Sequence, residues 1–137
     1  MSLVRAGNKI IISISGEVCS KANSRRMVPG RSKAGKLFMR PIKSEKALQF
    51  VDAAIRQVPI LPELLTQPLI AHIWIWYPSE RNDLDESLVL DVLQGRVYKN
   101  DRQIRERHVY HAVDRDNPRV NVEISPLRCV ATPKRSL

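Results

Sequence analysis

The segment between Pro68 and Pro78 limits the possible folds of this chain more than any other. It reads Leu-Ile-Ala-His-Ile-Trp-Ile-Trp-Tyr, an almost continuous apolar run rich in β-branched and aromatic residues. Such a run, ended by a proline, predicts a strand in the centre of a sheet. No apolar run in the chain approaches the roughly 20 residues of a membrane helix. We therefore expect a core built on a sheet, and no membrane as partner.

Four other segments have the composition of strands. Lys9–Ser15 contains four isoleucines and predicts a second buried strand, and Leu37–Met39 predicts a short one. Near the end of the chain, Val109–Val113 and Val120–Ile124 are separated by the polar residues 114–118. Two strand-like runs joined by such a short polar loop predict a β-hairpin.

Two segments have helical spacing. Ser44 can cap a helix that ends before Pro59 and Pro62, and its apolar positions are Ala47, Leu48, Val51, Ala54 and Ile55. A second helix carries Leu88, Val89, Val92 and Leu93 and ends near Gly95, before a turn at residues 98–101. The order of elements predicts an α+β fold, a mixed β-sheet with two helices packed on one face.

The size and composition predict one folded domain. With 137 residues and 43% hydrophobic residues, the chain can build one core over residues 1–137, with a frayed tail after residue 126. Cys19 and Cys129 are isolated in the sequence, so we expect both to be reduced. The N-terminus shows no apolar stretch of a secretory signal, and we expect a cytoplasmic location.

Positive charge is concentrated in a basic arm at residues 17–43. The whole chain has 23 Lys and Arg against 14 Asp and Glu, a net charge of +9, which favours an anionic partner such as nucleic acid. No acidic residue interrupts the cations of the arm, Lys21, Arg25, Arg26, Arg31, Lys33, Lys36, Arg40 and Lys43. Because it contains Pro29, Gly30, Gly35 and Pro41, we expect an irregular segment that contacts phosphates. A mobile surface loop and plain solubility are the alternatives.

Two carboxylates follow the central strand at a spacing that suits a metal site. Asp83 and Asp85 point the same way if their segment is extended, and Asp101 is the candidate third ligand. Such oxygen ligands suit Mg²⁺, which also binds phosphate oxygens. The alternatives are structural: Asp85 can cap the second helix and Asp101 can belong to a turn.

Other candidate sites receive less support. His108 and His111 lie three residues apart in a predicted strand and so face opposite sides, which argues against a shared zinc ion. His72 fits a satisfied sheet histidine, and Trp74 and Trp76 fit core or dimer-interface packing better than base stacking. The motifs GxGxxG, GxxxxGK[ST] and GxSxG are absent. Nothing therefore points to an organic small-molecule cofactor or to an esterase.

The segment from Asp83 to Ile104 resembles the RusA-type Holliday-junction resolvases, a family of phage-derived endonucleases. It reads Asp-Leu-Asp, then Leu-Asp-Val-Leu in the second helix, then Asn-Asp-Arg-Gln-Ile after a short turn. The family pattern is Asp-Leu-Asp-Asn, a helix with Leu-Asp-Ala-Leu, and Asp-Asp followed by a small or polar residue, Gln and Val or Ile. The layout of strands, helices and basic stretch agrees as well.

The resemblance implies a homodimeric, Mg²⁺-dependent endonuclease that recognises four-way DNA junctions by structure and nicks two strands symmetrically. The positions that match the metal-binding carboxylates of the family are Asp83, Asp85 and Asp101, and Asp91 matches a helix aspartate with a supporting role. The implied products are a 5′-phosphate and a 3′-hydroxyl, and the implied roles are DNA recombination and repair.

The sequence departs from the family pattern next to these carboxylates. The segment from Asp85 to Asp91 is two residues shorter, and Glu86 stands where the family has Asn. The family lysine on the helix has no counterpart at residues 87–90, and Arg81, Arg96 and Lys99 are candidate substitutes for its contact with phosphate. A basic protein that binds junctions without cutting them is therefore the alternative function.

Overall fold

Strand β5, Leu69–Tyr77, lies inside a five-stranded sheet with the order β1-β2-β7-β5-β6. The computed structural model describes residues 3–19, 25–31, 33–35, 37–43, 45–80 and 84–127. β5 pairs antiparallel with β7 and parallel with β6, so its predicted central position is confirmed. The other strands of this sheet are β1 (Leu3–Ala6), β2 (Lys9–Ser15), β6 (Ile104–Val113) and β7 (Arg119–Pro126). The sheet is mixed, as predicted.

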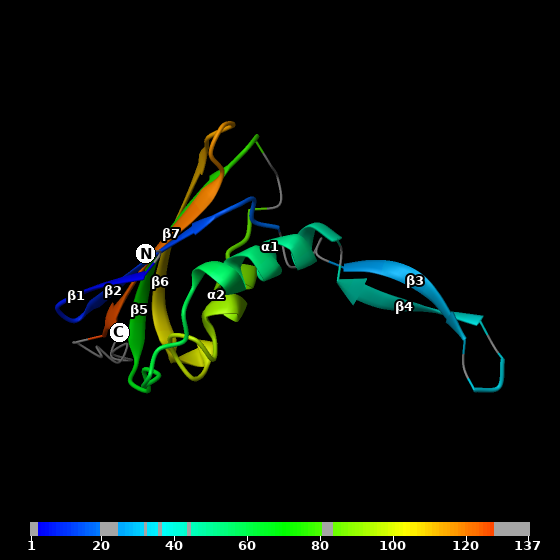
Figure 1. Cartoon of the computed structure of the whole chain (residues 1–137), viewed down its shortest axis with the longest axis horizontal. Helices are drawn as coiled ribbons and strands as arrows, with labels where there is room; N and C mark the ends of the chain where they lie inside the picture. The colour runs from blue at the N-terminus through cyan, green and yellow to red at the C-terminus, as the bar shows by residue number, and fades with distance from the viewer. Residues whose placement is uncertain are drawn as a thin grey trace, which may run out of the picture.

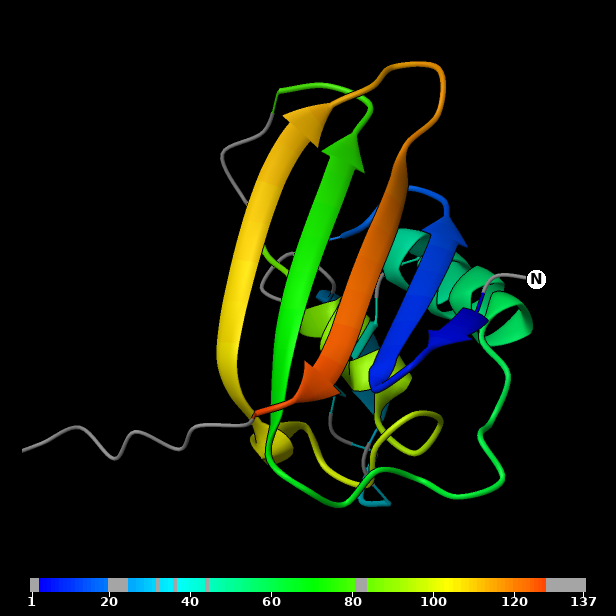
Figure 2. The ribbon, with the colours of Figure 1, turned by 90° about the vertical axis from the view of Figure 1, so that its left-hand side faces the viewer.

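The two helices cover one face of this sheet, as Figure 2 shows. They are α1, Glu45–Gln57, and α2, Ser87–Leu93, and the predicted α+β fold is confirmed. Burial along β5 alternates, with its odd-numbered residues against the helices and its even-numbered residues half-buried on the open face. Trp74 and Trp76 therefore share the open face, opposite Ile73 and Ile75, as their spacing predicts. None of the helices in the described part is long and apolar enough to cross a membrane.

Helix α1 meets the sheet through a narrower apolar face than its sequence suggested. It buries Ala47, Phe50 and Ala54, whereas Leu48 and Ile55 are 53% and 40% exposed. At its last residue, the Gln57 amide accepts a hydrogen bond from the Ser15 backbone N–H at 2.7 Å and donates to the Ser15 carbonyl at 3.0 Å. These two bonds hold the end of α1 against the end of β2.

The predicted hairpin of the last two strands is wrong. β6 and β7 do not pair with each other, because β5 lies between them. The loop at residues 114–118 crosses the end of β5, where the Asp114 backbone N–H donates to the Tyr77 carbonyl at 2.7 Å. An ion pair of 2.7 Å between Arg119 and Asp114 closes the loop, and the hydrogen bond from Arg119 lowers the pKa of Asp114. Strand β6 also begins earlier than expected, at Ile104.

Strand β1 was not predicted. It pairs antiparallel with β2 across the two-residue turn Gly7-Asn8, in which Gly7 has a φ of +61°. A two-residue turn with glycine in the left-handed region is a standard hairpin connection, so the signal was present in the sequence.

The basic arm is not the irregular segment that its prolines and glycines predicted. Residues of the arm form strands β3 (Arg25–Arg31) and β4 (Leu37–Lys43), which pair antiparallel in a separate two-stranded sheet. Pro29 lies opposite Met39 and Pro41 opposite Met27. Each strand has one partner, so the side of a proline that lacks an N–H can face outward. Figure 1 shows this hairpin extending away from the rest of the molecule, beyond α1.

Replacing Ile73 by Ala tests the assigned core. Ile73 is fully buried in β5, so the Ile73→Ala variant is expected to lose about 2 to 5 kcal/mol in free energy of unfolding. The matched control is Ile60→Ala, since Ile60 is 62% exposed and its loss is expected to change stability by no more than about 0.5 kcal/mol. Urea denaturation followed by tryptophan fluorescence measures both. Equal effects in the two variants would contradict the core.

Candidate nuclease site

The segment Leu84–Glu86 runs beside β6 and carries the first described carboxylate of the candidate site. Leu84 and His111 line the same pocket, and Glu86 pairs with Arg107 further along β6 toward its start. The segment therefore runs alongside β6 toward the first residues of that strand, which follow η1 (Asp101–Gln103) directly. Asp83 and Arg81, both predicted as site residues, lie outside the described residues.

Asp85 is held by groups from two elements. Its backbone N–H donates to the hydroxyl of Tyr77, the last residue of β5, at 3.2 Å. Its carboxylate Oδ1 accepts hydrogen bonds from the Ser87 backbone N–H at 3.0 Å and from the Ser87 hydroxyl at 2.8 Å. Glu86, which precedes α2 directly, makes no capping hydrogen bond with its side chain. The Asp85 carboxylate therefore accepts hydrogen bonds from the first residue of α2, in agreement with the alternative role of Asp85 at the start of this helix.

Asp101 is placed by a hydrogen-bonded turn. Its backbone N–H donates to Gln94 Oε1 at 3.0 Å, just after α2. The preceding Asn100 forms a capping box with Gln103, whose Nε2 also donates to the carbonyls of Leu65 and Gln67 at 2.9 and 3.1 Å. The Asn-Asp-Arg-Gln sequence therefore fixes Asp101 at the end of α2 and joins this turn to the segment before β5.

Tyr98 links the surroundings of Asp91 and Asp101. Its ring is fully buried, and its hydroxyl donates to the Leu90 carbonyl in α2 at 2.7 Å. Burial raises the pKa of Tyr98 well above its ordinary value, and the negative charges of Asp101 and Asp91 raise it further. The phenol is therefore protonated and remains a donor to α2. The hydrogen bond of this hydroxyl to Leu90 joins the turn before η1 to α2.

The described residues contain no group of three His, Cys, Asp or Glu side chains able to hold a metal ion. Asp83, the third predicted ligand, lies outside them. The available donors, Asp85 and Asp101, are carboxylates, and hard oxygen donors of this kind suit Mg²⁺. The metal site of Asp83, Asp85 and Asp101 stays a prediction.

The predicted DNA-contacting cations lie in different parts of the structure. Arg25, Arg26 and Arg31 belong to β3, and Arg31 and Lys33 are exposed. Lys99 is exposed in the turn after α2. Arg96 donates from Nη1 to the Val58 carbonyl at 2.8 Å, so its guanidinium joins the end of α1 to the end of α2. Lys21 and Lys36 lie outside the described residues.

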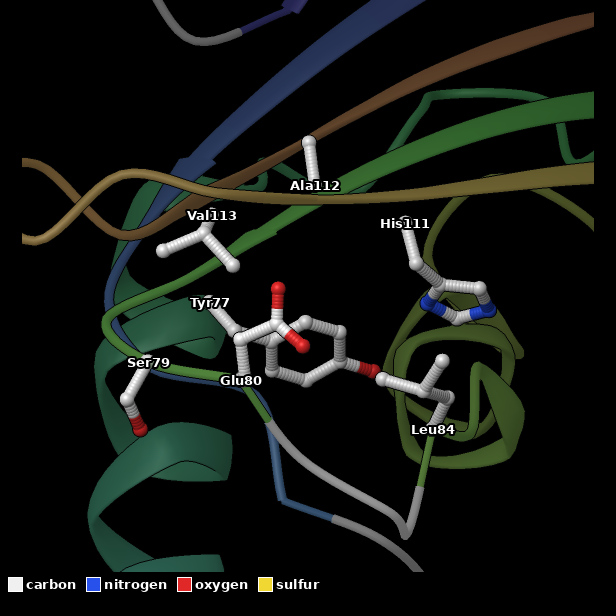
Figure 3. Close-up of a pocket in the computed structure, with 7 residues that line it drawn as sticks. All are labelled: Tyr77, Ser79, Glu80, Leu84, His111, Ala112 and Val113. Atoms are coloured by element: carbon white, nitrogen blue, oxygen red, sulfur yellow. The ribbon is translucent and has the colours of Figure 1, made fainter.

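Two residues of β6 were missed as members of the site. Arg107 Nη1 lies 3.2 Å from Glu86 Oε1, and the His111 ring stacks on Tyr77 with centroids 5.7 Å apart. Figure 3 shows His111 and Tyr77 with Glu80 and Leu84 around a pocket of about 300 Å³. In a strand, positions 107, 109 and 111 share one face. The alternation of residues along β6 could therefore have predicted that Arg107 and His111 lie on the same side of the sheet.

His108 lies on the other face of β6, as predicted from its spacing to His111. It stacks against His72 at 4.8 Å, and Tyr110 stacks against Trp74 at 5.6 Å. The guanidinium of Arg119 lies 4.1 Å from the centre of the Trp76 ring. These rings present one face to a neighbouring side chain, which leaves less ring surface for stacked bases.

Comparison with known proteins identifies the family. No curated protein matches the chain. The family model of the endodeoxyribonuclease RusA matches residues 19–125, most of the chain. The matched interval contains the β3–β4 hairpin, both helices and the complete segment from Asp83 to Ile104. The site described above therefore lies within the matched domain, and the chain belongs to the RusA endodeoxyribonuclease family.

Proposed function

We propose that this protein is a structure-selective endodeoxyribonuclease that resolves four-way DNA junctions by paired nicks, in DNA recombination and repair. The observation that carries the proposal is the RusA family match over residues 19–125, which includes Asp83, Asp85, Asp101 and the basic hairpin. Paired nicks at a symmetric junction need two sites, so the proposed active form is a homodimer.

In the proposed site, Asp83, Asp85 and Asp101 would hold Mg²⁺ and Asp91 would have a supporting role. A bound Mg²⁺ supplies charge stabilisation to the scissile phosphate and lowers the pKa of water. The protein contributes the placement of its carboxylates. Asp85 is held through Tyr77 and Ser87, and Asp101 is held through Gln94 and the capping box. Because hydrogen bonds to uncharged groups hold both residues, little reorganisation is needed when DNA binds.

The proposed DNA-binding segment is the basic arm at residues 17–43. Figure 1 shows the β3–β4 hairpin of this arm extending away from the rest of the molecule, and a segment rich in Lys and Arg attracts a phosphate backbone. The proposed contacts are Lys21, Arg25, Arg26, Arg31, Lys33 and Lys36 in the arm, with Arg81, Arg96 and Lys99 nearer the carboxylates. Phosphate contacts of this kind carry no sequence information, which fits recognition of a junction by shape.

A junction-binding protein without catalysis is the second candidate. It is favoured by the shortened segment before Asp91 and by the absence of a lysine at residues 87–90. Both candidates bind DNA in a salt-sensitive way, and only the nuclease needs its carboxylates for more than folding.

The variant Asp85→Asn separates the two candidates. Asparagine keeps an oxygen that can accept from Ser87 but loses the charge, so folding and junction binding are expected to persist. Nicking of a labelled mobile four-way junction in Mg²⁺ is expected to fall by about 100-fold or more. The control Asp52→Asn removes an exposed carboxylate of α1 and is expected to nick at the wild-type rate.

Three results are possible in this assay. Paired nicks on the junction, absent with linear duplex and with Asp85→Asn, support the resolvase. Tight junction binding by an inactive wild-type protein supports the second candidate. Equal binding of junction and duplex contradicts both.

A second test addresses the hairpin. The double variant Arg25→Ala, Arg26→Ala is expected to weaken junction binding and to reduce the slope of log K against log salt by about 2, roughly one for each lost phosphate contact. Fluorescence anisotropy over a salt series measures the slope. The control Arg56→Ala removes an exposed arginine of α1 that pairs with Asp52. A slope equal to that of the control would remove the hairpin from the DNA interface.

A further inference from the structure

Four carboxylates precede, occupy or follow helix α2 near the candidate site. Asp85 and Glu86 precede α2, Asp91 lies on it, and Asp101 follows it. A phosphate that approaches these carboxylates is repelled unless cations lie among them. The family pattern places a lysine on this helix, and the corresponding stretch here, residues 87–90, is Ser-Leu-Val-Leu. The following inference rests on the proposed function and adds one cation, supplied by β6, to the candidates Arg81, Arg96 and Lys99.

Arg107 pairs with one of these carboxylates, that of Glu86. It is opposite Ala71 in the β5–β6 register, and Ala71 belongs to the buried, helix-facing side of β5. Arg107 therefore points to the face of the sheet on which α2 lies. Its Nη1 reaches Glu86 Oε1 at 3.2 Å, and its positive charge also lowers the pKa of Tyr98, which Asp91 and Asp101 raise. The guanidinium of Arg107 therefore pairs with the carboxylate that directly precedes α2.

The geometry of Arg107 leaves it able to bind a phosphate. Its side chain is 44% exposed, while that of Glu86 is 21% exposed. A guanidinium has five N–H donors in a planar fork, and the pair with Glu86 engages Nη1. Arg96, the arginine that follows α2, donates to the Val58 carbonyl instead. Of these two arginines, Arg107 is exposed and Arg96 is only partly exposed, so Arg107 is the more accessible to a phosphate.

We propose that Arg107 is a further phosphate-contacting cation of this site and that Glu86 positions it. Two departures from the family pattern then belong together. The helix has lost its lysine, and the family asparagine has become Glu86, whose charge can orient a guanidinium supplied by β6. A half-exposed ion pair of this kind contributes little to stability, so stability alone does not explain the exchange.

The test is single-turnover nicking of a four-way junction at saturating protein in Mg²⁺, with the junction Kd and Tm measured in parallel. Arg107→Ala is expected to lower the nicking rate by about 10- to 100-fold while Kd changes by less than about 3-fold. Arg107→Lys is expected to recover most of the rate, since an ammonium also binds phosphate. Glu86→Gln is expected to give an intermediate loss. Arg105→Ala, an exposed arginine of the same strand, is the control with the wild-type rate.

The outcomes distinguish this inference from the proposed function. Nicking by Arg107→Ala at the wild-type rate, with Asp85→Asn inactive, overturns the role of Arg107 and leaves the nuclease intact. A lost rate that falls together with Tm and is not recovered by Arg107→Lys assigns Arg107 a structural role and also overturns the inference. A wild-type protein that nicks no junction overturns the proposed function and this inference together.

Discussion

The pairing of β5 on both of its edges is the constraint on which the rest of the structure depends. Because β6 is parallel to β5, the chain must cross over between them, and α2 lies in that crossover. The crossover places Leu84–Glu86 beside β6 and delivers η1 to the start of that strand. The positions of Asp85 and Asp101 in space follow from this topology. Strand β7 then occupies the remaining edge of β5 and leads the sheet to β2 and β1.

Uncharged side chains perform most of the positioning at the candidate site. Tyr77 and Ser87 hold Asp85, Gln94 and the Asn100–Gln103 box hold Asp101, and Tyr98 holds α2 through the Leu90 carbonyl. Uncharged hydrogen-bonding groups fix the geometry of the site without adding a charge that would neutralise a carboxylate. Charge enters from β6, where Arg107 meets Glu86. A substitution in the crossover is therefore expected to act on the site through packing, and a substitution of Arg107 through electrostatics.

Local sequence patterns predicted an element correctly where the residues of that element alone determine its structure. The isoleucines of β2, the apolar run of β5 and the spacing of α2 were assigned correctly because burial of alternate or helically spaced residues is a local pattern. The arm was assigned incorrectly because Pro29, Gly30 and Pro41 suggest irregular structure, yet an isolated two-stranded hairpin tolerates proline on its open edges. β6 and β7 were joined as a hairpin because nothing local reveals that β5 lies between them. The short β1 was overlooked although Gly7-Asn8 is a recognisable turn.

The sequence by itself determined the class of fold, the acidic pattern from Asp83 to Asp101, the basic character of the arm and the resemblance to RusA nucleases. These properties depend on residue type and spacing, which can be read directly from the sequence. Only the tertiary structure decided that Arg107 meets Glu86, that His111 stacks on Tyr77 and that Arg96 bonds to Val58. Such contacts join residues that are distant in sequence, and they depend on which strand edge is paired and on which face a side chain points. Spacing does not contain that information, because it arises when the elements pack.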